Sequence, residues 1–144
     1  MSGRLPYVKR KFYPHMIFDE AELWTDFINK YPERFDTVDY DFRVGEGVVL
    51  AADNDEEFIR MAKMLSQKRI DVIAWNDEQP TIIEVKTRVG LGTLGQLLGY
   101  KLLFKREFTI FPDPDLMVVT KLIDPDDTYI LLQNRIKIAV LKNA

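Results

Sequence analysis

The chain has 144 residues, of which 47% are hydrophobic and 30% charged, and its formal net charge is −3. This length most simply makes one domain with a sizeable core. The absence of cysteine and the single histidine, His15, exclude disulfide scaffolds, thiol nucleophiles and zinc sites built from cysteine or several histidines. No apolar run approaches the ~20 residues of a membrane span, so we expect a soluble, cytoplasmic protein with no membrane partner.

Residues 1–18 form a basic N-terminal arm. They contain no acid, and no apolar stretch follows them, so we expect no signal peptide. The aromatic residues Tyr7, Phe12 and Tyr13 are interleaved with the basic ones, a mixture typical of nucleic-acid contacts. A flexible tail is the alternative interpretation.

The first helix is expected to begin after Asp19, which forms a capping box with Glu22. Its apolar residues recur at helical spacing up to Pro32. These residues are Leu23, Trp24, Phe27, Ile28 and Tyr31. Strands over residues 38–44 and 48–52 are expected to follow, joined by a glycine-containing turn.

Residues 53–67 are predicted to be a helical insertion. Asp53 and Glu56 have the spacing of a second capping box, and an apolar stripe follows. The stripe consists of Phe58, Met61, Ala62 and Leu65. Because residues 53–57 are acidic, we expect them to face away from DNA, or to bind a second copy of the chain or another protein.

The second half of the chain alternates further strands and one long helix. Strands are expected over residues 70–75 and 81–86, joined by a turn-like linker, followed by a helix over residues 91–106. Three more strands are expected over residues 116–120, 128–132 and 136–141. The order predicts an α/β fold in which a mixed central sheet is flanked by helices.

Charged residues stand inside the two central apolar strands. Asp71 lies in the first strand, and Glu84 and Lys86 share one side of the second. Two carboxylates brought together by adjacent strands repel each other unless a cation lies between them, and oxygen ligands favour Mg²⁺ or Mn²⁺. The alternative is a buried ion pair without catalysis.

Three short motifs occur in order along this region. They are the Asp71 strand Arg69–Ile73, the Glu-x-Lys strand Thr81–Lys86 and the helical segment Gly95–Tyr100. Together they resemble the core of the PD-(D/E)xK nuclease superfamily, and Gln96 and Tyr100 match the Gln-x-x-x-Tyr motif of its RecB-type members. More narrowly, the chain resembles the catalytic domain of the NucS/EndoMS mismatch endonucleases. Only residues 1–18 precede the first expected helix, so we expect no counterpart of their separate N-terminal domain, and mismatch specificity is not implied.

The resemblance implies a restriction-endonuclease-like core and roles for individual residues. Asp71, Glu84 and the Val85 carbonyl would hold the divalent ion, and Lys86 would act at the attacking water or the scissile phosphate. Gln96 and Tyr100 would hydrogen-bond the substrate backbone or brace the metal ligands.

The family also carries a glutamate on its first helix. Glu20 matches it, because Glu20 lies three residues before Leu23 on the apolar stripe whereas Glu22 lies on the opposite side.

The function expected from this resemblance is a Mg²⁺-dependent DNA nuclease, most simply an endonuclease of DNA processing or repair. A phage-encoded nuclease in an infected host would fit a catalytic core without a recognition domain. The basic residues expected to contact DNA are Lys9, Arg10, Lys11, Arg88 and Lys101. A non-catalytic DNA-binding or assembly module on the same fold is the alternative, and a dimeric Holliday-junction-type resolvase is another enzyme of this class.

Overall fold

The computed structural model describes residues 2–142. These residues form one six-stranded sheet and four helices. In chain order the elements are β1 (Leu5–Pro6), α1 (Phe18–Lys30), β2 (Thr37–Val44), α2 (Glu56–Ser66), β3 (Lys68–Asn76), β4 (Gln79–Arg88), α3 (Leu91–Glu107), β5 (Asp115–Leu122), α4 (Pro125–Gln133) and β6 (Ile136–Val140). None of the helices in this range is both long enough and apolar enough to cross a membrane.

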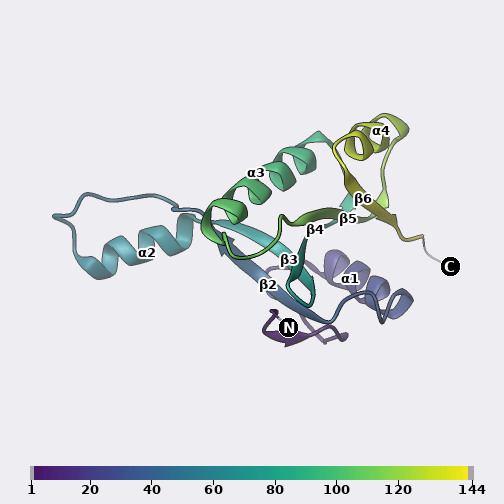
Figure 1. The fold of residues 1–144 in the computed structure, drawn as a ribbon, viewed down its shortest axis with the longest axis horizontal. Coiled ribbons are helices and arrows are strands. Elements are labelled where there is room, and N and C mark those ends of the chain that lie inside the picture. The colour runs from purple at the N-terminus through teal and green to yellow at the C-terminus, as the bar shows by residue number, and fades with distance from the viewer. Residues whose placement is uncertain (1, 143–144) are drawn as a thin grey trace.

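The sheet is mixed, and its spatial order follows the chain from β1 at one edge to β6 at the other (Figure 1). Neighbouring strands from β1 to β4 are antiparallel, whereas β4, β5 and β6 are parallel. Parallel neighbours need a crossover connection, and α3 and α4 supply the two crossovers. The predicted mixed sheet flanked by helices is therefore confirmed.

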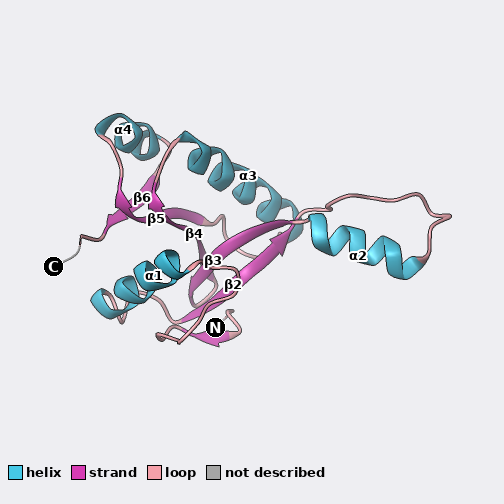
Figure 2. Cartoon of the chain, turned by 180° about the vertical axis from the view of Figure 1, so that it is seen from behind, coloured by secondary structure: helices cyan, strands magenta, loops and turns pink. Residues whose placement is uncertain are grey.

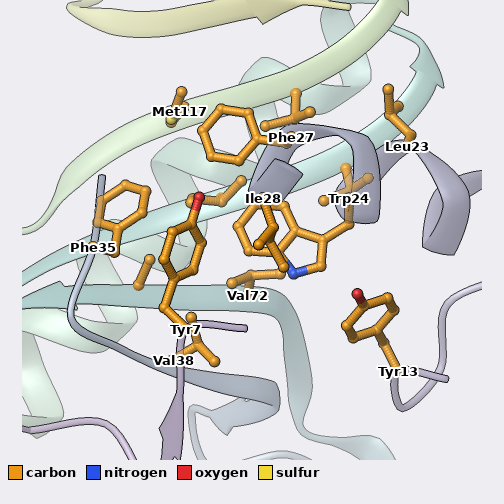
Figure 3. Close-up of a cluster of buried hydrophobic side chains, with 14 of the residues drawn as sticks. Tyr7, Tyr13, Leu23, Trp24, Phe27, Ile28, Phe35, Val38, Val72 and Met117 are labelled. Atoms are coloured by element: carbon orange, nitrogen blue, oxygen red, sulfur yellow. The ribbon is translucent and has the colours of Figure 1, made fainter. Parts of the chain in front are cut away.

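Helices α1 and α3 cover opposite faces of the sheet (Figure 2). On the α1 face, Trp24 is fully buried and stacks on Phe27 with ring centroids 5.2 Å apart (Figure 3). The indole Nε1 of Trp24 donates to the Tyr40 hydroxyl at 2.9 Å, so the polar atom of the ring is satisfied inside the core. On the α3 face, Phe104 and Leu97 pack on Ile73 and Trp75. The alternating strands and the stripe of α1 thus pack as their periodicity predicts.

The aromatic residues of the N-terminal arm belong to the core. Tyr7 and Tyr13 are 5% and 1% exposed and lie beside Trp24 (Figure 3). The Tyr7 hydroxyl donates to the Tyr31 carbonyl at 2.8 Å, and β1 pairs with β2. Only Phe12 of the three aromatic side chains is exposed, at 71%. The arm is therefore packed onto the fold, and the interpretation of Tyr13 as a nucleic-acid contact is wrong.

Both predicted capping boxes are wrong, and the N-cap residue lies two positions from the predicted one in each case. Helix α1 begins at Phe18, one residue before Asp19, and its N-cap residue Ile17 makes no side-chain hydrogen bond. Helix α2 begins at Glu56, and its cap is Asp55, whose carboxylate accepts from the Glu57 N–H at 3.3 Å. In α1 the apolar face that packs on the sheet sets where the helix begins. Helix α2 buries no side chain, and among the acids at its start it is Asp55, not Asp53, that makes the cap bond.

Two segments predicted to be strands have other structures. Residues 48–52 form a loop, in which the Val48 N–H donates to the Ser66 hydroxyl at 2.6 Å instead of joining a strand. Residues 128–132 lie in helix α4, because the Asp124 carboxylate accepts from the Asp127 N–H at 2.7 Å and Pro125 occupies the first turn. An aspartate cap followed by proline is a strong helix start, and it overrides the strand preference of Thr128, Tyr129 and Ile130.

Residues 45–67, which we call the α2 arm, leave the sheet between β2 and β3 and project from the body (Figures 1 and 2). Hydrogen bonds close the base of the arm, where the Gln67 side-chain amide donates to the Gly45 carbonyl at 2.6 Å. The helix predicted within residues 53–67 is confirmed as α2. Its side chains are not buried by the rest of the chain.

Candidate active site

Strands β3 and β4 stop pairing at the two central acids. Their ladder runs from Asn76 opposite Gln79 to Val72 opposite Ile83, and the next residues across from each other are Asp71 and Glu84. The Val85 N–H donates to Asp71 Oδ2 at 3.2 Å. A side chain thus replaces the backbone partner at the point where the strands separate, and both acids lie at this opening.

Strand β3 is also irregular on its other side. It pairs with β2 on both sides of Asp71, but Asp41, directly opposite, has a left-handed φ of 49° and makes no pair there. Val72 packs in the α1-side core and Ile70 in the α3-side core, although residues two apart share a face in a regular strand. Such irregularities re-aim side chains, and here Asp71 is aimed at β4.

Glu84 is held in an environment that disfavours its charge. The residue is 2% exposed, and its Oε1 has no hydrogen-bond partner within the described residues. Burial, followed by the charge of Asp71, raises the pKa of Glu84 to about 8. Burying a carboxyl oxygen without a partner costs free energy of folding unless a cation or a hydrogen-bond donor reaches it. Glu84 is therefore the clearest candidate for a metal ligand in this structure.

Asp71 and its neighbours complete an electrostatic cluster. Burial is the largest cause of the raised pKa of Asp71, the Val85 N–H opposes it, and the charges of Glu20 and Lys86 act in opposite directions. Glu20 is half-buried in the first turn of α1 while Glu22 is exposed, as the helical stripe predicts. Within residues 2–142, however, no three or more acidic, histidine or cysteine side chains are grouped to hold one ion. The charge of Glu20 raises the pKa of both Asp71 and Glu84.

Lys86 opens onto a positively charged hollow beside the acids. No carboxylate lies within 4 Å of its ammonium among the residues described. Lys86, Arg88 and Gln96 line an open hollow of about 430 Å³ together with the first residues of α3. Helix N-termini present backbone N–H groups that favour anions, so this hollow suits a phosphate group.

The two residues of the Gln-x-x-x-Tyr pair on α3 have different neighbours. Tyr100 lies near the acids, and Gln96 lines the hollow. Tyr100 is 9% exposed, and burial, then the charges of Glu84 and Asp71, raises its pKa to about 12. Tyr100 therefore lies within electrostatic reach of both carboxyl groups. Gln96 is exposed one helical turn earlier and lines the hollow of Lys86 as well as a second one next to Tyr100.

The residues expected to contact DNA lie in two places. Arg88 lines the hollow with Lys86, and Lys101 is half-buried next to Tyr100 on α3. Lys9, Arg10 and Lys11 are exposed on the N-terminal segment, whose aromatic side chains pack on the α1 face. Arg88 thus lies beside Lys86, Lys101 follows Tyr100 on α3 without lining either hollow, and the N-terminal three belong to a different part of the surface.

Three residues near the site did not stand out in the sequence. Thr93, which is 5% exposed, lines the Lys86 hollow, and Lys68 lines the second hollow with Gln96. Asp41 Oδ2 lies 3.1 Å from His15 Nε2, and Asp41 Oδ1 lies 3.6 Å from Arg69 Nε, so the loop residue His15 is paired rather than free. An acid inside the predicted strand 38–44 was the available signal for Asp41.

Comparisons with known proteins identify no relative whose site could be compared with this one. No protein-family model matches the chain, and no curated protein or solved structure matches it. The chemistry of the site therefore follows from its own groups. These are the adjacent carboxyl groups of Asp71 and Glu84, of which Glu84 Oε1 has no hydrogen-bond partner among the described residues, the Lys86 ammonium and the cationic hollow.

Proposed function

We propose that the protein is a divalent-metal-dependent nuclease that hydrolyses phosphodiester bonds in DNA, on a restriction-endonuclease-like core. The observation that carries the proposal is the unpartnered, buried Oε1 of Glu84 beside Asp71, at the point where β3 and β4 separate. A catalytic carboxyl pair is expected to be perturbed in this way. A role in DNA processing or repair follows from the substrate.

The donor set fits a hard divalent cation. Asp71 and Glu84 supply carboxylate oxygens, and the Val85 carbonyl lies on the same strand as Glu84. Oxygen donors of this kind favour Mg²⁺ or Mn²⁺ over softer metals. When bound, such an ion would compensate the two buried charges and stabilise negative charge developing on a phosphoryl oxygen.

The remaining residues have roles that their positions support. Lys86, free of a carboxylate partner, would donate to a phosphoryl oxygen or orient the attacking water. Arg88 and the start of α3 would hold a neighbouring phosphate in the hollow. Gln96 would donate to the substrate backbone at the mouth of the hollow, and Tyr100 would brace the acids.

Cleavage of supercoiled plasmid and of single-stranded DNA, with Mg²⁺, Mn²⁺ or a chelator, tests the proposal. Asp71→Asn keeps an oxygen acceptor for the Val85 N–H, and Lys86→Ala removes a half-buried ammonium with its methylene stem and leaves no buried charge unpaired, so both variants should fold. Each should lose at least about 100-fold in cleavage rate. Lys137→Ala, an exposed lysine on β6 paired with Asp115, is the matched control and should cleave like the wild type.

Cleavage that survives in both variants, or that proceeds equally well in chelator, would refute the assigned site. A non-catalytic DNA-binding module is the second candidate, because the cationic hollow of Lys86 and Arg88 would hold a phosphate without any metal. This module would bind DNA in a salt-dependent manner and leave it intact with either ion.

A further inference from the structure

The α2 arm carries an apolar face that nothing in residues 2–142 covers. Phe58, Met61 and Leu65, at i, i+3 and i+7, are 60%, 48% and 68% exposed. Helix α2 has 11 residues and no buried side chain, and it projects away from the sheet (Figures 1 and 2). Isolated helices of this length are marginal in water, so the face requires a partner.

The charges of the arm are separated along its length. The tip is acidic, with Asp53, Asp55, Glu56 and Glu57 around the start of α2. The base carries three cations, Lys63, Lys68 and Arg43, against two acids, Glu46 and Glu107, whose Oε2 accepts from the Gly45 N–H at 3.0 Å, so it is positive on balance. Two copies of a surface that is acidic at one end and basic at the other are complementary in charge when they lie antiparallel.

We propose that two copies of the chain associate through an antiparallel pair of α2 helices. The acidic tip of each arm then lies at the basic base of the other arm, and the two helix dipoles are opposed. Reversal about a two-fold axis near Met61 places Phe58 of one copy against Leu65 of the partner subunit. Each contact occurs twice, as an isologous interface requires, and the pair is closed.

The size of the surface sets the strength of association. One pair of short helices buries less than the about 1,600 Å² of a standard interface, so dissociation constants in the micromolar range are expected. The pairing needs only the projecting arm and leaves the Lys86 hollow at the start of α3 open. The inference therefore stands independently of the nuclease proposal.

Sedimentation equilibrium of the full chain, over about 5 to 500 μM, tests the inference. The wild type should form dimers, and Leu65→Glu should weaken the association at least about tenfold, because it places a charge in the apolar contact. Leu102→Glu on α3 is the matched control, since Leu102 is also 68% exposed, and it should leave the dimer unchanged.

Charge reversal tests the orientation of the two arms. A tip variant, Glu56→Lys with Glu57→Lys, and a base variant, Lys63→Glu with Lys68→Glu, should each self-associate at least about tenfold more weakly. An equimolar mixture should dimerise again, because each acidic end then meets a basic one. Monomeric wild type at the highest concentration, loss of the dimer only in Leu102→Glu, or a mixture that stays monomeric would overturn the inference.

Discussion

Glu84 lies in a position that disfavours the charged form of its carboxyl group. Its backbone belongs to a central strand, its side chain is buried, and its Oε1 has no partner among the described residues. Placing an acid there lowers the stability of the metal-free protein, and a residue of similar shape without charge would avoid that loss. Destabilised groups of this kind cluster at functional sites because the ligand compensates them.

The metal-free protein should lose stability as the pH rises. The pKa of Glu84 is raised by burial from 4.5 to about 8, so between these values the folded state binds more protons than the unfolded chain. The stabilisation is complete below the unfolded pKa and is lost as the pH rises through the folded one. Urea unfolding in chelator should show the free energy of unfolding falling by up to about 1.4 kcal/mol per pH unit.

Glu84→Gln should flatten this dependence and keep more stability at the alkaline end. Glu78→Gln, in the exposed turn between β3 and β4, is the control and should retain the wild-type slope. An unchanged slope in Glu84→Gln would show that other groups cause the pH dependence.

Helix α4 illustrates how an element is decided by its first residues. The run Thr128–Leu132 has the β-branched and aromatic composition of a strand, yet it is helical. Asp124 caps the helix through the Asp127 N–H, and the structure uses α4 as the crossover between the parallel strands β5 and β6. Cap and crossover together outweigh the local strand preference.

Removal of the cap should destabilise the protein measurably. Asp124→Ala leaves the Asp127 N–H without its acceptor and is expected to lower the free energy of unfolding by about 1 kcal/mol. Asp126→Ala, in the same first turn but without a cap bond, should cost only a few tenths. Urea denaturation of both variants checks this, and equal losses would mean that the charge near the helix dipole, rather than the hydrogen bond, is responsible.

The N-terminal segment contains two kinds of residue that differ in burial. Tyr7 and Tyr13 complete the core under α1, whereas Lys9, Arg10 and Lys11 remain exposed beside them. The sequence pattern combines both kinds of residue and does not separate them. Burial separates them, because an aromatic ring inside the core excludes water and a lysine beside it stays solvated.

Deleting the residues up to Val8 should therefore destabilise the fold. The deletion removes β1 and Tyr7, which packs on Trp24 and Phe35, and the loss is expected to be about 3 kcal/mol by analogy with aromatic truncations in cores. Replacing Lys9, Arg10 and Lys11 by alanine should leave the unfolding temperature unchanged but weaken DNA binding and its salt dependence. Thermal unfolding and binding at several salt concentrations separate the two roles. A deletion that unfolds at the wild-type temperature would contradict the packed arrangement.

The sequence by itself determined the elements whose patterns are local. The alternation of β2, the apolar runs of β3 and β4, the stripe of α1 and the positions of α2 and α3 are patterns of neighbouring residues along the chain. The two central acids, the Glu-x-Lys spacing and the separation of Gln96 from Tyr100 were likewise evident along the chain.

Only the tertiary structure decided which of these residues meet. Asp71 and Glu84 are 13 positions apart, and they come together because β3 and β4 pair in one register and separate at Val72 and Ile83. The lack of a partner for Glu84 Oε1, the burial of Tyr7 and the exposure of α2 likewise depend on groups distant in sequence. Register, burial and the choice of partner are set by packing between elements. They cannot be predicted from the residues of one strand or helix alone.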